Sequence, residues 1–85
     1  MKAIQILGKE YKIEYVDNKT LGGNYGDCNT TKAYIRINKE ITKQQQEDTL
    51  LHEVLHIISD ELKIELEERQ VHPLATALYS IGVRV

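Results

Sequence analysis

His52-Glu53-Val54-Leu55-His56, near the middle of this 85-residue chain, follows the pattern H-E-x-x-H. In a helix, residues four positions apart lie one above the other on the same face. The imidazoles of His52 and His56 can therefore reach one metal ion. Glu53, about 100° further round the helix, can reach a water molecule beside that ion. Two histidines with an acidic third ligand and a water molecule are typical of a catalytic zinc site.

The residues around this pattern favour a helix that packs on a core. Counted at about 100° per residue, the apolar positions fall within one arc of roughly 160°. The histidines lie just outside that arc and Glu53 lies on its other flank, so the pattern borders the core. The alternative is two surface histidines beside a solvated glutamate. The apolar positions are Leu50, Leu51, Val54, Leu55, Ile57, Ile58 and Leu62.

The helix is expected to begin after Thr42, a suitable N-cap, and to run to about Leu62. The acidic residues Glu47 and Asp48 come too late for a capping box. A second helical pattern spans Ile64 to Ile81, with Pro73 inside it. Either that helix kinks at the proline, or a regular helix begins near it.

The N-terminal half predicts strands and a loop. Apolar residues alternate with polar ones on both sides of Gly8-Lys9, which predicts a β-hairpin with a type II′ turn. Residues 17–32 are rich in Gly, Asn, Asp and Thr and predict a long loop. Residues 33–38 alternate again and predict a third strand. The expected fold is α+β: a small antiparallel sheet of about three strands, then two helices, in one domain spanning residues 1–85.

Composition restricts the partners and the compartment. Eleven basic and thirteen acidic residues give a net charge of −2, and no basic patch is present, so a nucleic-acid partner is not expected. No segment has the length of a membrane span, and the N-terminus lacks the apolar run of a signal peptide. One cysteine excludes an internal disulfide and favours a reducing, cytoplasmic location.

The third metal ligand has several candidates. Glu68 falls at the edge of the apolar stripe of the second helix, where it can face the first helix. Glu67 would point into the stripe and Glu65 towards solvent, while His72 lies one turn beyond Glu68 on the same flank. All three glutamates can also form an ordinary solvated acidic run. Cys28 is a further possible ligand or inhibitory thiolate, although a half-buried free thiol is the more common state of such a residue.

The order of these elements resembles the ImmA/IrrE-type metallopeptidases and their small phage-borne relatives. The strand Ile35-Arg36-Ile37-Asn38 precedes the H-E-x-x-H helix, and a later segment reads Glu68-x-x-Val71-x-x-Leu74-Ala75-x-x-Leu78. The resemblance covers roughly residues 33 to 82. It implies a minimal zincin-like fold that binds one zinc ion per chain.

By this resemblance, His52, His56 and Glu68 are the zinc ligands and Glu53 is the general base. In zincin folds the strand before the site helix is commonly an exposed edge that pairs with an extended peptide, so residues 33–38 are expected at an edge. The family acts on repressors of mobile elements, which implies a protein substrate of that kind.

Three functions remain open from the sequence. The first is a zinc endopeptidase in which His72, Tyr25, Tyr34 or Tyr79 steadies the oxyanion. The second is a zinc-bound, non-catalytic binding protein that keeps the same fold. The third is a small α+β interaction module without a metal.

Overall fold

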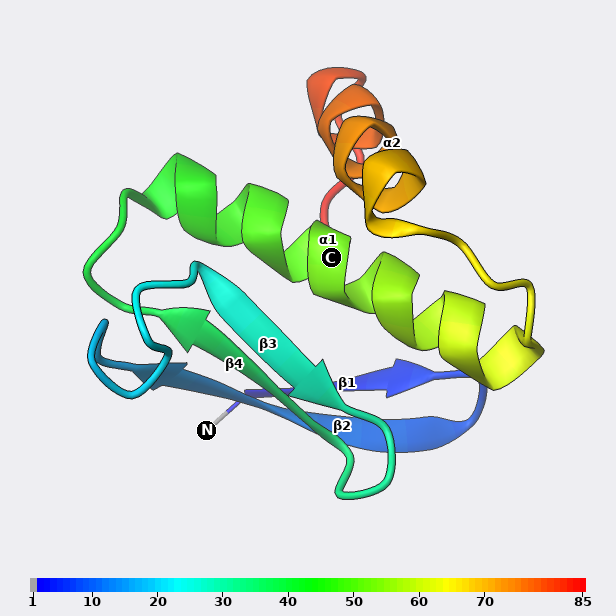
Figure 1. The fold of residues 1–85 in the computed structure, drawn as a ribbon, viewed down its shortest axis with the longest axis horizontal. Helices are drawn as coiled ribbons and strands as arrows, with labels where there is room; N and C mark the ends of the chain where they lie inside the picture. The colour runs from blue at the N-terminus through cyan, green and yellow to red at the C-terminus, as the bar shows by residue number, and fades with distance from the viewer. Residues whose placement is uncertain (1) are drawn as a thin grey trace.

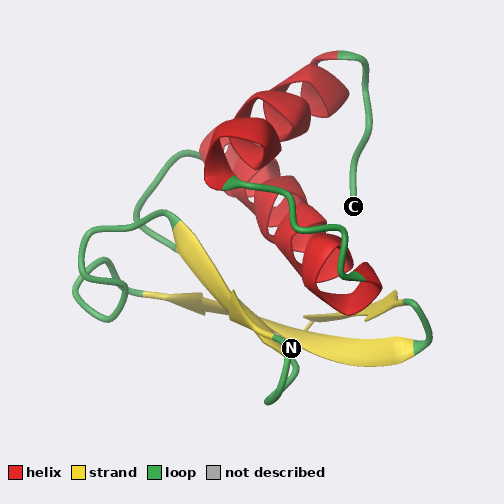
Figure 2. Ribbon diagram, turned by 45° about the vertical axis from the view of Figure 1, so that its right-hand side comes forward, coloured by secondary structure: helices red, strands yellow, loops and turns green. Residues whose placement is uncertain are grey.

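A computed structural model describes residues 2–85 as four β-strands followed by two α-helices, which confirms the α+β class. Helix α1 lies across one face of the sheet, and α2 packs on α1 on the side away from the sheet (Figures 1 and 2). The elements are β1 (Lys2–Ile6), β2 (Lys9–Val16), β3 (Gly26–Asn29), β4 (Tyr34–Asn38), α1 (Lys43–Leu62) and α2 (Glu68–Ser80).

The sheet is mixed, with the strand order β1-β2-β4-β3. β1 pairs with β2 and β3 pairs with β4 in antiparallel fashion, whereas β2 and β4 are parallel. The prediction of about three antiparallel strands was therefore wrong. The extra strand, β3, lies inside the predicted loop 17–32. Its sequence, Gly-Asp-Cys-Asn, lacks apolar alternation, and its pairing with β4 defines it as a strand.

The expected edge position of residues 33–38 was also wrong. β4 occupies the interior of the sheet between β2 and β3, and β3 is the edge strand on that side. The chain leaves β2, passes the end of β4 and enters β3 before it returns as β4 (Figure 1). Two backbone hydrogen bonds fix this crossing, from the Asn38 N–H to the Tyr25 carbonyl and from the Lys39 N–H to the Val16 carbonyl, each 2.8 Å long.

The β1–β2 hairpin forms, but with another turn. The two loop residues are Leu7 and Gly8, and Ile6 pairs with Lys9. Both loop residues have positive φ, 51° and 81°, which indicates a type I′ turn in place of the predicted type II′ turn. The turn thus begins one residue earlier than the position of the glycine indicated.

The core lies between the sheet and α1. Tyr11 is fully buried in this core, and its hydroxyl donates a 2.8 Å hydrogen bond to Glu61 Oε1 near the end of α1. The alternation in the strands therefore sends one set of side chains to the helix and leaves the charged set on the opposite face. The buried set comprises Ile6, Tyr11, Ile13, Ile35 and Ile37 from the sheet, with Leu50, Val54 and Ile57 from α1.

Both helices have well-defined ends. Thr42 caps α1, and a capping box is present because Gln45, and not an acidic residue, supplies the reciprocal hydrogen bond. Helix α2 begins at Glu68 and passes through Pro73, five residues later, so the proline does not begin it. Gly82, with φ 97°, follows its end in a Schellman arrangement.

Neither helix of residues 2–85 is long and apolar enough to cross a membrane.

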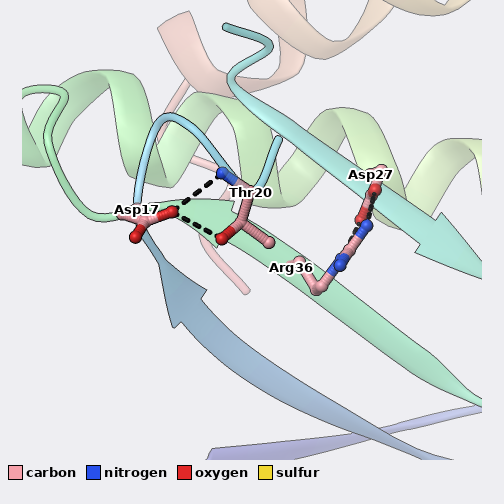
Figure 3. A network of polar contacts seen from close by, with 4 residues as sticks. All are labelled: Asp17, Thr20, Asp27 and Arg36. Atoms are coloured by element: carbon pink, nitrogen blue, oxygen red, sulfur yellow. Dashed lines mark hydrogen bonds and ion pairs between the residues drawn. The ribbon is translucent and has the colours of Figure 1, made fainter. Parts of the chain in front are cut away.

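Two polar contacts hold the segment between β2 and β4 (Figure 3). In the loop, Asp17 Oδ1 accepts hydrogen bonds from the backbone N–H and the hydroxyl of Thr20. Across the edge of the sheet, the Asp27 carboxylate pairs with the Arg36 guanidinium through two hydrogen bonds. Asp27 and Arg36 are register partners on β3 and β4, so their pairing secures the edge strand.

Asn38 is the buried anchor of the same segment. Its side-chain amide donates to Asn18 Oδ1 at 2.7 Å and to the Asn24 carbonyl at 3.1 Å, and its oxygen accepts from the Glu40 N–H at 2.8 Å. The residue is fully buried. The Asn38 side chain therefore supplies hydrogen-bond partners to Asn18, to the Asn24 carbonyl and to the Glu40 N–H.

We expect Asn38→Ala to lower the free energy of unfolding by about 2–3 kcal/mol, because buried groups lose their partners. Urea denaturation followed by circular dichroism measures this loss. The matched control is Asn24→Ala, since the Asn24 side chain is exposed and only its carbonyl takes part in the contact. An equal effect of both substitutions would show that Asn38 does not anchor the loop.

Candidate metal centre

Helix α1 presents His52 and His56 to the same side. Their Nε2 atoms lie 3.1 Å apart, and their rings meet edge to face with centroids 4.8 Å apart. Both side chains are partly exposed, at 17% and 28%. The predicted one-turn spacing therefore brings the two nitrogens together at a solvent-accessible position beside the core.

Glu68, the first residue of α2, completes the group. Its Oε1 lies 2.7 Å from the Nε2 of His52, and its Oε2 lies 2.7 Å from the Nε2 of His56. Among residues 2–85, these three side chains are the group whose donor atoms converge closely enough for one metal ion. The sequence-derived ligand set is thus assembled at one point, from two helices.

The link between the helices sets the position of Glu68. Lys63 ends α1 in the left-handed conformation, with φ 55°. The Ser59 hydroxyl then accepts a 2.7 Å hydrogen bond from the Leu66 N–H, and the Ser59 carbonyl accepts one from the Ile64 N–H. Because the buried hydroxyl holds the link against α1, the first residue of α2 faces the histidines.

Ring protons can account for the two contacts with Glu68. If each Nε2 carries its proton, His52 donates to Oε1 and His56 donates to Oε2. The two nitrogens then lie 3.1 Å apart with neither proton directed at the other ring. Ligands about 2.0 Å from a tetrahedral zinc ion are about 3.3 Å apart. The separations here, 2.7 Å and 3.1 Å, are somewhat shorter than that.

The other proposed third ligands lie elsewhere. Glu67 pairs with Arg69, and its backbone N–H donates to the Gln70 side chain at the start of α2. Glu65 belongs to the exposed link and has a positive φ of 56°. His72 remains close, with its ring centroid 5.7 Å from that of His52. It lies next to the candidate metal group, which consists of His52, His56 and Glu68, but does not belong to it.

Glu53 points from α1 towards β3 and is only 7% exposed. Burial raises the pKa of its carboxyl, and the contact with Cys28 and the charge of His56 oppose this effect only in part. A raised pKa makes this carboxylate a stronger base than an exposed glutamate. Its position beside the histidines is the one expected of the predicted general base.

Cys28, on β3, is a half-buried free thiol beside Glu53. Burial and the neighbouring Glu53 charge raise its pKa to about 12, so the thiol stays protonated at neutral pH. Burial lowers the pKa of His52, although Glu68 opposes the shift, and this favours the neutral ring that a metal requires. Cys28 is also not among the side chains whose donor atoms converge, whereas His52 is.

A cleft of about 740 Å³ opens over this group. Its floor is α1, one wall is β3 with the residues just before it, and Glu68 and His72 of α2 line the other side. At the start of β3, Gly26 lies so close to α1 that an added Cβ would be 2.7 Å from Thr49 Cγ2 and 2.8 Å from the Arg36 carbonyl. The edge strand therefore lies directly against the site helix.

Sequence reasoning missed two carboxylates in this cleft, Asp48 and Asp60. Asp48 precedes His52 by four residues and Asp60 follows His56 by four, so all four side chains share one helix face. That spacing is visible in the sequence and could have identified them.

No protein-family model matches the chain, and searches of curated proteins and of solved structures found no significant match.

We expect Glu53→Gln to raise the free energy of unfolding at neutral pH in the presence of a chelator. A carboxyl whose folded pKa exceeds its unfolded value destabilises the fold above that pKa and has no such effect below the unfolded value. The gain should therefore shrink as the pH falls from the raised folded pKa towards 4.5, the ordinary value for glutamate, and be absent below it. Urea denaturation across this range measures it. Glu10→Gln, at an exposed position, should change stability little at any pH, and a Glu53→Gln gain that does not vary with pH would contradict the assignment.

Proposed function

We propose that this chain is a small zinc metallopeptidase with a minimal zincin-like fold, similar to the ImmA/IrrE-type family. The observation that carries the proposal is the convergence of His52, His56 and Glu68, whose donor atoms meet at 2.7–3.1 Å. Two imidazoles and one carboxylate from two helices match a catalytic zinc site with an open fourth position. The buried carboxylate of Glu53 beside them supports hydrolysis over simple metal storage.

The residues of the cleft have distinct roles in this reaction. Zinc would supply polarisation of the substrate carbonyl and a lowered pKa for the attacking water. Glu53 accepts the proton of that water and returns it to the leaving amine. The burial that raises its pKa strengthens it as a base.

His72 is the best-placed donor for the oxyanion. It lines the cleft next to His52, whereas Tyr79 is engaged with Glu47 and Tyr34 does not line the cleft. Tyr25 also lines the cleft, but its hydroxyl lies beside Gln45, further towards the start of α1. We therefore assign oxyanion stabilisation to His72.

The substrate is proposed to be an extended protein segment. β3 is the edge strand of the sheet and forms a wall of the cleft, so a peptide can pair with it over the metal group. This role falls to β3, since β4 is interior. By its resemblance, the enzyme would act in the cytoplasm on a phage or mobile-element regulator, and the single free thiol fits that compartment.

We expect protein purified without added metal to contain about one zinc per chain, measured by elemental analysis. Glu68→Gln should lower the zinc affinity at least about tenfold, because the neutral amide is a poor ligand. Glu67→Gln is the control, as its carboxylate pairs with Arg69. Zinc should also dissociate below about pH 5, where the histidines become protonated. Equal zinc affinity in the two variants would refute Glu68 as a ligand.

We expect Glu53→Gln to retain zinc and to lose nearly all proteolysis, by a factor of about 10³ or more, since the general base is removed. Cleavage of unfolded casein followed by mass spectrometry measures the loss, with zinc content determined on the same sample. A zinc-loaded wild-type chain without cleavage, together with intact biological activity of the variant, would favour the non-catalytic binding protein.

A further inference from the structure

The lining of the cleft is strongly acidic. Of its fourteen residues five are carboxylates, and none is lysine or arginine. Three of the five have a counter-charge. Asp27 pairs with Arg36, while Glu53 and Glu68 lie at the metal group, where a dication would balance them. The carboxylates of the lining are Asp27, Asp48, Glu53, Asp60 and Glu68.

Asp48 and Asp60 have no counter-charge. Neither takes part in an ion pair within the part of the chain that the structure describes, residues 2–85. Asp48 Oδ1 is buried and has no hydrogen-bond partner among those residues. A buried acceptor without a partner is costly. The residue as a whole is only partly buried and lines the cleft, so its charge acts on a molecule bound there. The cleft therefore keeps two negative charges even when a dication is bound.

The two aspartates bracket the metal group symmetrically. Asp48, His52, His56 and Asp60 follow one another at four-residue steps, which places each aspartate about 9 Å along the helix axis from the midpoint of the histidines. An extended peptide advances about 3.3 Å per residue. Each aspartate therefore lies about three peptide residues from the bond at the metal.

A peptide on β3 would run along this row. Gly26 of β3 lies against Thr49 of α1. Two residues further along β3, Cys28 lies beside Glu53, which is four residues beyond Thr49 on α1. Two strand residues span about 6.6 Å and four helix residues about 6 Å, so β3 and α1 run side by side in the same direction. The two elements keep this course in Figure 1. A strand added to the free edge of β3 would consequently follow the axis of α1.

We propose that the cleft selects peptides with a lysine or arginine about three residues before the scissile bond, after it, or on both sides. The proposal rests on the proposed peptidase function for the position of that bond. Asp48 would bind one basic side chain and Asp60 the other. The same charges repel acidic peptides and nucleic acid.

The test compares two synthetic peptides that differ at two positions. One carries lysine at the third residue on each side of a central Leu-Leu bond, and the other carries glutamine there. Binding to the zinc-supplemented Glu53→Gln chain is measured by fluorescence anisotropy at low ionic strength, so that no cleavage interferes. The lysine peptide should bind about tenfold tighter, and molar salt should reduce this preference.

Matched variants assign the effect. In Asp48→Asn/Asp60→Asn the preference for lysine should fall to about twofold or less. Glu10→Gln/Glu14→Gln removes the same two charges from exposed positions on the opposite face of the sheet and should preserve the preference. Circular dichroism verifies that each variant folds. If the double variant does not fold, Asp60→Asn alone replaces it, because Asp60 is exposed. This single variant should remove about half of the preference on a logarithmic scale.

The outcomes separate the two proposals. Equal affinity for both peptides, an unchanged preference in the aspartate variants, or no binding of either peptide below millimolar concentration overturns the selection for basic residues. Zinc content is measured on the same samples. Zinc with no lysine preference refutes this inference and leaves the metallopeptidase standing. A lysine preference without zinc refutes the metallopeptidase and leaves an acidic peptide-binding cleft.

Discussion

The contact between Glu68 and the two histidines joins the start of the second helix to α1, and a hydrogen bond from the Tyr79 hydroxyl to Glu47 joins its end. Helix α2 contacts α1 and no strand, and within it only Val71 and Ala75 are buried. Such a small apolar contact contributes little to holding a 13-residue helix in place. The carboxylate that lies between two imidazoles is therefore both a ligand candidate and a structural fastening. A bound dication would strengthen both roles, as small domains often require.

The second constraint is the close approach of β3 to α1. With glycine at position 26, the backbone of the edge strand lies against Thr49, and this brings the strand alongside the row of side chains that contains the histidines. The same approach buries Glu53 between strand and helix, which raises its pKa. The wall of the cleft, the basicity of Glu53 and the course available to a peptide thus all depend on one contact between backbone and helix.

The convergence of His52, His56 and Glu68 could be anticipated from the sequence because it depends largely on local periodicity. The spacing of His52 and His56 fixes two donors, and the stripe on the second helix restricts the third to a few residues. The sheet was harder, because period two reveals which face a residue occupies but neither the direction nor the order of strands. β3 could not be recognised, since its four residues, Gly-Asp-Cys-Asn, show no apolar alternation and form a strand only by pairing with β4.

The turn at Leu7-Gly8 and the N-cap of α1 show smaller limits of the same kind. Glycine indicated a turn but not which residue precedes it in the loop, and Leu7 adopts a positive φ that its type does not favour. Gln45 completes the capping box although only acidic residues were considered for that role. In both places the local pattern was right about the element and wrong about its final residue.

The short link between the helices has a consequence for how this domain can vary in length. Ser59 accepts hydrogen bonds from the backbone N–H groups of residues 64 and 66 and so holds the link against α1. Lys63 and Glu65 adopt left-handed backbone conformations, which keep the link short. One inserted residue after Leu66 would turn Glu68 through about 100° and carry its carboxylate away from the imidazoles. The number of residues between His56 and Glu68 is therefore a length that this domain cannot change without separating the three side chains.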